Sequence, residues 1–82
     1  MENNNSEIKV VTFQTHYGAM LLGKNLGNCC KVRSVPRSLS SSCGSCVFVT
    51  DKTLEEVLEA SDMELLEAVY LFDGKEYRKI YG

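Results

Sequence analysis

Apolar and polar positions follow a period of two in some stretches of the chain and of three to four in others. Alternation with period two, and short runs rich in β-branched and aromatic residues, are both typical of strands. Residues 8–13 are a β-branched and aromatic run, residues 29–34 alternate, and residues 46–50 are an apolar run expected to form a largely buried strand. In the second of them, alternation predicts that Cys30 and Val32 face inward and that Cys29, Lys31 and Arg33 face outward.

The segment between the first two predicted strands has a helical pattern. Thr15 is a suitable N-cap, and the helix is expected to extend to about residue 26. Gly27 follows, at the position where a left-handed cap residue is common. One apolar stripe recurs at helical spacing along this segment: Ala19, Leu22, Gly23 and Leu26. The pattern therefore predicts one amphipathic helix whose Gly23 allows close approach to a sheet.

A second helix is expected after the third strand. Thr53 and Glu56 form a capping-box pattern, and Leu54, Val57 and Leu58 are predicted to face inward. The C-terminal end of this helix stays open on sequence alone, because the chain can leave the helix at Ser61 and Asp62 or add a further turn through residues 63–66.

The last part of the chain predicts a hairpin. Residues 68–72 and 76–81 have strand character, and Asp73-Gly74 between them is typical of a two-residue turn. That register predicts that Tyr70 lies opposite Tyr77, as a cross-strand aromatic pair.

The predicted order β-α-β-β-α-β, with one added C-terminal strand, indicates an α+β ferredoxin-like sandwich. Both helices are expected on one face of an antiparallel sheet. We expect residues 1–7 to be a flexible polar tail and residues 8–82 to be a single domain. If the first helix is a crossover, its start and the loop after the second strand lie at the same edge of the sheet, so Thr15 and His16 are expected near Cys43.

Composition refines this picture. The 82 residues have no apolar run of membrane-spanning length and no signal-peptide pattern at the start, so a cytoplasmic location and no membrane partner are expected. The formal net charge of −2 conceals an uneven distribution. Residues 8–50 carry five basic and no acidic side chains, whereas residues 51–82 carry nine acidic and four basic ones. All four cysteines lie in the basic part, and nearby positive charge favours a thiolate.

The main candidate for chemistry is the loop before the third strand, which contains Cys43-Gly44-Ser45-Cys46. A CxxC spacing lets two sulfurs meet each other or share a metal. Backbone N–H groups of the turn, the first helix dipole, and Arg37 or Arg33 could stabilise a Cys43 thiolate. The alternative is that both thiols are unreactive and only pack where the loop enters the strand.

A metal site lacks a second matched pair of ligands. Cys29 and Cys30 are adjacent, so on a strand their side chains point to opposite faces. We therefore expect no metal and no other cofactor. His16 is the candidate proton partner of Cys43, although a lone histidine at a helix start is more often simply solvated.

The serines before Cys43 could form an anion cradle. Ser41, Ser42 and Gly44 offer hydroxyl and backbone donors, with Arg37 as the charge partner. The frame of a nucleotide-phosphate loop is absent. An acidic total and the lack of paired aromatic residues argue against a nucleic-acid partner.

Two segments resemble a known family. Val11-Thr12-Phe13-Gln14-Thr15-His16 and the stretch from Val35-Pro36-Arg37-Ser38 to Ser41-Ser42-Cys43-Gly44 are similar to the small bacterial selenium/sulfur carrier protein-like family, over roughly residues 8–72. The resemblance implies that Cys43 is the carrier cysteine. Cys46 and the weakly charged segment 21–26 depart from the family pattern.

The resulting hypothesis is a carrier that holds a sulfane sulfur or selenium atom on Cys43 and exchanges it with donor and acceptor proteins. Cys46 would then act as a resolving thiol, attacking the loaded adduct and forming a disulfide with Cys43. Two alternatives remain open. One is a non-catalytic interaction module that dimerises through the C-terminal edge strand, and the other is a CxxC thiol-disulfide or metal-binding protein.

Overall fold

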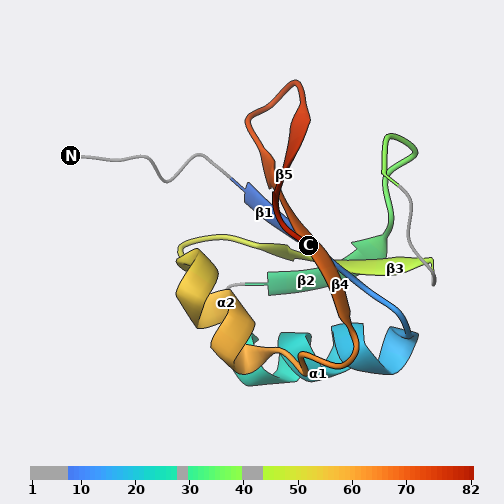
Figure 1. Ribbon diagram of the computed structural model, residues 1–82, viewed down its shortest axis with the longest axis vertical. Helices are drawn as coiled ribbons and strands as arrows, with labels where there is room; N and C mark the ends of the chain where they lie inside the picture. Colours follow the sequence, from blue (N-terminus) through green and yellow to red (C-terminus); the bar gives the residue numbers. More distant parts are fainter. Residues whose placement is uncertain (1–7, 28–29, 40–43) are drawn as a thin grey trace.

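The computed structural model describes residues 8–27, 30–39 and 44–82. The predicted 1–7 tail therefore lies outside the described residues. The elements follow the order β-α-β-β-α-β-β (Figure 1). Their bounds are β1 Ile8–Phe13, α1 His16–Leu26, β2 Cys30–Ser34, β3 Ser45–Val49, α2 Leu54–Ala60, β4 Leu66–Phe72 and β5 Tyr77–Tyr81.

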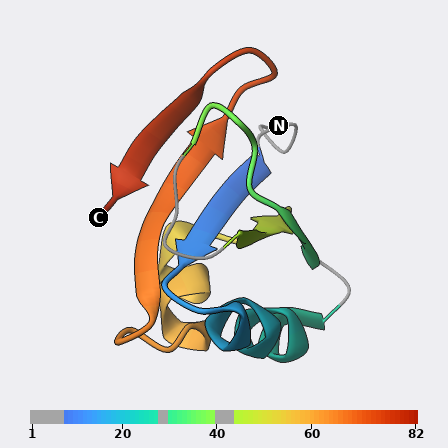
Figure 2. The ribbon, with the colours of Figure 1, turned by 90° about the vertical axis from the view of Figure 1, so that its right-hand side faces the viewer.

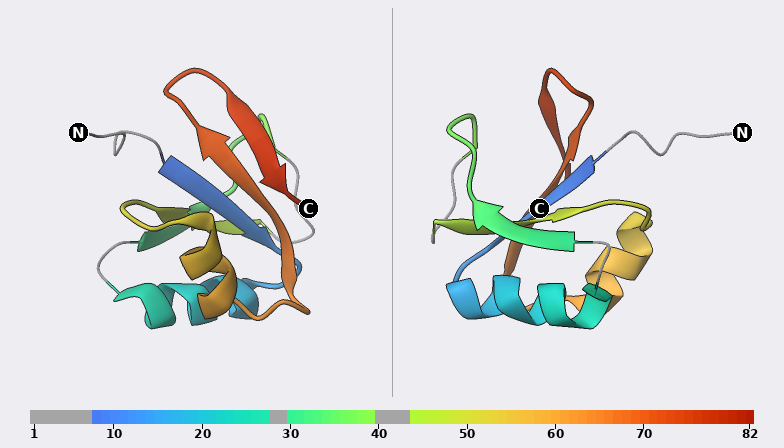
Figure 3. Two further views of the ribbon diagram at one scale, coloured as in Figure 1. Left: turned by 60° about the vertical axis from the view of Figure 1, so that its left-hand side comes forward. Right: turned by 180° about the vertical axis from the view of Figure 1, so that it is seen from behind.

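The five described strands form one sheet in the order β2-β3-β1-β4-β5. Every neighbouring pair is antiparallel. Both described helices lie on the same face of this sheet (Figure 3). The predicted α+β class, the antiparallel sheet and the element order are confirmed, and β5 is the added strand beside β4 at one edge (Figure 2).

Helix α1 begins where the sequence predicts. Thr15 is its N-cap, and the Thr15 hydroxyl accepts a hydrogen bond from the Gly18 N–H at 3.2 Å. Ala19 and Leu22 are buried, as expected for its apolar stripe. Gly27 closes the helix with a φ of 71°, a value that favours glycine.

Helix α2 has the complete capping box. The Thr53 hydroxyl accepts from the Glu56 N–H at 3.2 Å, and the Glu56 carboxylate accepts from the Thr53 N–H at 2.9 Å. The helix ends at Ala60, which decides the end that the sequence left open. A turn follows, in which Asp62 O accepts from the N–H groups of Leu65 and Leu66. Strand β4 therefore starts at Leu66, two residues earlier than predicted.

The core lies between the sheet and the helices. Its buried members are apolar and come from both layers, so neither layer is stable without the other. They are Val11, Phe13, Ala19, Leu22, Val47, Val49, Val57, Leu66 and Val69. Burying each aliphatic or aromatic side chain of this size stabilises the fold by roughly 1.5–3 kcal/mol before entropy is counted.

The C-terminal hairpin differs from the prediction. Phe72 pairs with Tyr77, so residues 73–76 form a four-residue connection rather than a two-residue turn. The Asp73 carboxylate accepts from the N–H groups of Lys75 and Glu76, at 2.9 and 3.0 Å, and these bonds stabilise the longer turn. The predicted Tyr70–Tyr77 pair was therefore wrong.

The actual cross-strand pairs at this hairpin are different. The rings of Phe72 and Tyr77 stack, with centroids 4.5 Å apart. Tyr70 lies opposite Lys79, after a register shift between Val69 and Tyr70. The Lys79 Nζ lies 6.0 Å from the centroid of the Tyr70 ring.

None of the helices in the described part of the chain combines the length and apolar character that crossing a membrane requires.

Candidate functional site

The candidate site is the connection between β2 and β3. At its base, the Val35 N–H donates to the Gly44 carbonyl at 3.1 Å, and Ser34 pairs with Ser45. A turn follows Val35, in which the Leu39 N–H donates to the Pro36 carbonyl at 3.0 Å. Both described ends of the connection are therefore held by backbone hydrogen bonds.

Three of the predicted site residues, Cys43, Ser41 and Ser42, lie outside the described residues. Gly44 is exposed at the start of the segment that leads into β3. Arg37 is exposed in the turn after β2.

The start of α1 meets the start of β3. The His16 Nδ1 lies 2.7 Å from the Ser45 Oγ, a hydrogen bond whose donor depends on the tautomer of the ring. Ser45 is two residues after Cys43 in the sequence. The start of α1 and the start of β3 therefore lie side by side, whereas the expected proximity of His16 to Cys43 falls outside the described residues.

Close packing at the first turn of α1 fixes this meeting point. Gly18 is buried, and a Cβ atom there would lie 2.8 Å from Phe13 Cδ2 and 3.0 Å from Leu65 Cβ. The neighbouring backbone is also fixed, because the Gln14 N–H donates to the Leu65 carbonyl at 2.7 Å. A glycine therefore lets the helix lie directly on the end of β1, which sets the position of His16.

Cys46, the second cysteine of the CxxC, is 0% exposed. Its Sγ lies 3.6 Å from the Ser34 carbonyl oxygen, to which the thiol donates. The register places it opposite Thr12 on one side and Arg33 on the other, on the sheet face away from the helices. A fully buried thiol has no access to a bulky adduct, which favours the alternative in which Cys46 packs as a small apolar residue.

Cys30 points toward α1, as the alternation predicts. Its Sγ lies 3.4 Å from the Gly23 carbonyl oxygen and 3.3 Å from the Gly27 carbonyl oxygen, so the single S–H is shared between these two acceptors. The missing side chain of Gly23 makes room for β2 here, since a Cβ would lie 3.3 Å from Val32 Cγ2. Cys29 lies outside the described residues. Among the described residues, no three His, Cys, Asp or Glu side chains are grouped closely enough to hold a metal ion.

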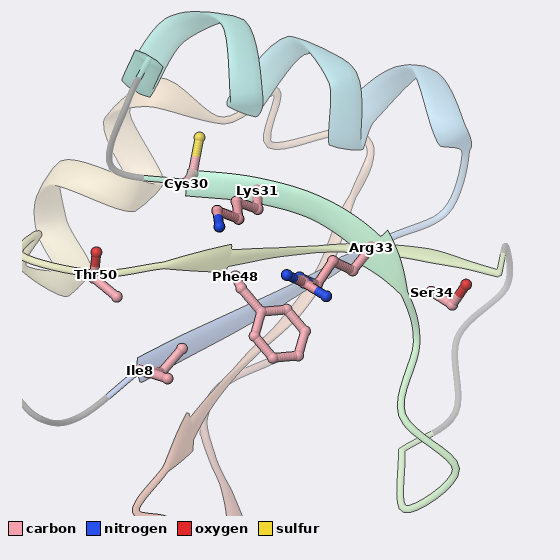
Figure 4. A pocket seen from close by; sticks show the side chains of 7 residues that line it. All are labelled: Ile8, Cys30, Lys31, Arg33, Ser34, Phe48 and Thr50. Atoms are coloured by element: carbon pink, nitrogen blue, oxygen red, sulfur yellow. The ribbon is translucent and has the colours of Figure 1, made fainter.

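The opposite face of β2 forms part of a groove with a volume of about 770 Å³ (Figure 4). Lys31 and Arg33 line it from β2, Phe48 from β3, and Ile8 from β1. The sequence pattern alone does not predict this groove. Alternation along β2 does predict that Lys31 and Arg33 face outward, but only the strand order brings Phe48 and Ile8 beside them.

A family model for putative Se/S carrier protein-like sequences matches residues 9–81. The chain belongs to this family. The match covers nearly all of β1 and extends to the end of β5, so the carrier-family domain includes the added C-terminal strand. Neither the curated proteins nor the solved structures contain a match to the chain.

Proposed function

We propose that the protein is a sulfur or selenium carrier in which Cys43 holds a sulfane sulfur or selenium atom and delivers it to an acceptor protein. Membership of the carrier family supports this assignment. The chain would exchange one atom between partner proteins and would not turn over a small substrate alone.

The observation that carries the proposal is the hydrogen bond of His16 to Ser45, at 2.7 Å. It ties the N-terminal end of an 11-residue helix to a residue two positions from Cys43. The partial positive charge of a helix N-terminus stabilises nearby anions, and a thiolate is the form of cysteine that accepts sulfur. His16 is exposed and in our proposal takes the thiol proton.

The proposed loading step conserves atoms and electrons. The Cys43 thiolate attacks the outer sulfur of a donor persulfide, a new S–S bond forms on Cys43, and the donor sulfur leaves as a thiolate. In the release step an acceptor thiolate attacks the outer sulfur of the Cys43 persulfide, and Cys43 leaves as a thiolate. With a perselenide donor, the selenium atom takes the place of the transferred sulfur.

The other predicted site residues have a proposed role in holding the charged adduct. Ser41, Ser42 and Gly44 would donate hydroxyl or backbone hydrogens to the outer sulfur, and Arg37 would supply positive charge. The absence of any acidic residue between positions 8 and 50 supports an anionic adduct here.

Release by the acceptor thiolate is preferred in this proposal over release by Cys46. The resolving role needs the Cys46 sulfur to reach Cys43, and Cys46 is fully buried and hydrogen-bonded to the Ser34 carbonyl. When the acceptor takes the outer sulfur, Cys43 leaves as a free thiolate, and a free thiolate persists in a reducing environment, so we propose a reducing compartment such as the cytoplasm.

We further infer that the domain has the ferredoxin-like topology. The order β2-β3-β1-β4, with α1 and α2 as the connections on one face, supports this inference, and β5 extends the sheet beyond β4. The edge position of β5 also supports a second candidate, a homodimer formed along this strand. Size-exclusion chromatography of a Tyr77→Lys variant tests the homodimer, which this change on the edge strand should disrupt. A carrier would load sulfur equally well with this change.

The test of the carrier proposal is the thiol pKa of Cys43, obtained from alkylation rate against pH in a Cys29→Ala/Cys30→Ala/Cys46→Ala variant. We expect a pKa clearly below the roughly 8.5 of a free thiol. The matched control has Cys43 changed to Ala with Cys29 retained. An ordinary pKa for Cys43, equal to that of Cys29, would contradict the proposal.

A further inference from the structure

The groove beside β2 lies on the sheet face that the two described helices leave uncovered (Figures 3 and 4). The register explains its make-up. Lys31 pairs with Phe48, and Phe48 pairs with Val10, so these three side chains project from the same face in one row across the sheet. Arg33 is two residues along β2 and projects from that face too. We call this surface the cationic groove.

The floor of the cationic groove is apolar. Phe48 is half-buried, and Ile8 of β1 lines the same surface. Val10, between them, is fully buried and supports the floor from within the sheet. An apolar side chain of a ligand placed here would remove Phe48 and Ile8 from water, which favours binding.

The wall of the cationic groove is positively charged. Lys31 and Arg33 are both exposed, and none of the described residues that line the groove is acidic. Among these residues, no carboxylate therefore competes with a ligand for the two cations. The groove therefore has charge complementarity for an anion that carries an apolar group a few ångströms from its charges.

We propose that the cationic groove binds an acidic segment of a partner protein, with carboxylates on Lys31 and Arg33 and an apolar side chain on Phe48 and Ile8. The identity of this partner as the sulfur donor or acceptor rests on the proposed function. β2 ends at Ser34, directly before the connection that contains Cys43, so a segment bound along β2 leads toward the carrier loop.

A protein segment fits these observations better than a nucleic acid. Single-stranded nucleic acid is bound by a basic track with successive aromatic platforms, whereas the cationic groove combines two cations with one aromatic ring.

The test is a binding titration with the full chain carrying Cys43→Ser, so that sulfur loading plays no part. The probe is a fluorescein-labelled peptide, acetyl-Glu-Asp-Phe-Glu-Asp amide, followed by fluorescence anisotropy. Its uncharged counterpart, with Gln and Asn, is the control ligand. We expect the double variant Lys31→Glu/Arg33→Glu to bind about tenfold or more weakly. Raising the ionic strength from about 0.01 M to about 0.15 M weakens the wild-type interaction as well.

Lys24→Glu is the matched control variant, because Lys24 is an exposed lysine on α1 and does not line the cationic groove. It should bind the acidic peptide as the parent protein does. If circular dichroism shows that the double variant does not fold, the binding surface is mapped instead from the amide chemical-shift changes that the peptide causes in the parent protein. These changes should cluster at Ile8, Lys31, Arg33 and Phe48.

Equal binding of the acidic and uncharged peptides, or equal loss in the Lys24→Glu control, overturns the proposal. Tighter binding of an oligothymidine than of the peptide overturns it in favour of nucleic acid. A concentration-dependent dimer that the double variant abolishes overturns it in favour of a second copy of the chain. Loading of the unchanged protein by glutathione persulfide is measured separately, so a failed carrier function and a failed cationic groove give different results.

Discussion

The His16 imidazole and the Ser45 hydroxyl are hydrogen-bonded at 2.7 Å, although 29 positions separate them in the sequence. This bond connects the start of α1 to the start of β3, the strand that directly follows the proposed carrier loop. Because an antiparallel sheet with a helical crossover brings these two ends to one edge, the fold itself brings His16 and Ser45 together.

Removing this hydrogen bond should slow sulfur transfer more than it lowers stability. We expect His16→Ala to reduce the rate of Cys43 loading by about tenfold or more, since the proposed proton acceptor is lost. The free energy of unfolding should fall by less than about 1.5 kcal/mol. Loading rates are measured by intact mass spectrometry of samples quenched at successive times, and stability is measured by urea denaturation.

A variant of Ser45, the hydrogen-bond partner of His16, and a control variant test whether the effect on loading comes from this bond. Ser45→Ala should also slow loading, and the double variant should be no slower than His16→Ala alone, because the two side chains act together. Tyr17→Ala, at the exposed neighbouring position, should load normally. Strict additivity of the two single effects would show that His16 and Ser45 act independently.

Cys46 should be inert in the folded protein. Its Sγ is fully buried, so alkylation requires local or global opening. In a Cys29→Ala/Cys30→Ala/Cys43→Ala variant we expect iodoacetamide to react at least about 100-fold more slowly than in denaturant. A folded-state rate close to that of the unfolded chain would restore the resolving role that the CxxC spacing suggested.

Gly18→Ala should destabilise the protein by about 1–3 kcal/mol, because the new Cβ would meet Phe13 and Leu65 at 2.8 and 3.0 Å. Alanine otherwise favours an exposed helix, so the sign of the change is informative. Gly44→Ala is the matched control, since no atom of the described residues lies within 4 Å of its Cβ position. Urea denaturation measures both, and a stabilised Gly18→Ala protein would disprove the close contact.

Two exposed carboxylates should make stability depend on acid pH. The Thr53 backbone N–H lowers the pKa of Glu56 below its usual 4.5, and the N–H groups of Glu76 and Lys75 lower the pKa of Asp73 below its usual 3.8. Both pKa values are lower in the folded than in the unfolded state. Their contribution to stability is therefore complete above the unfolded values and is lost as the pH falls through the folded ones.

Unfolding free energies between about pH 6 and pH 3 test this expectation. The Glu56→Gln/Asp73→Asn variant should lose less stability over this range than the parent protein. Glu55→Gln, which removes an exposed carboxylate from the same helix and leaves the capping box intact, is the control. A pH dependence unchanged in the double variant would contradict the assignment.

Local patterns predicted most of the fold. β1, α1 and the start of α2 depend on a β-branched and aromatic run, on the Thr15 cap and on the Thr53 capping box, all of which act within a few residues. The hairpin was mispredicted for the same reason, because Asp73-Gly74 is a strong short-turn signal. The Asp73 side chain instead accepts bonds from residues two and three positions ahead and favours a longer connection.

The candidate site was only partly accessible to sequence reasoning. The crossover rule predicts that the start of α1 lies close to Cys43, and Cys43 lies outside the described residues. Nothing local indicated that His16 would be hydrogen-bonded to Ser45. The burial of Cys46 and the combination of Lys31 with Phe48 depend on strand order and register, which involve residues distant in sequence. Tertiary arrangement therefore decided both points.

The most direct test of the carrier assignment is intact mass spectrometry of the protein after exposure to glutathione persulfide. We expect the parent protein to gain the mass of one sulfur atom and dithiothreitol to remove it. The gain should persist in Cys46→Ala and be absent in Cys43→Ser. A Cys43→Ser protein that gains the sulfur as readily as the parent, or a parent protein that gains none, would contradict the carrier assignment.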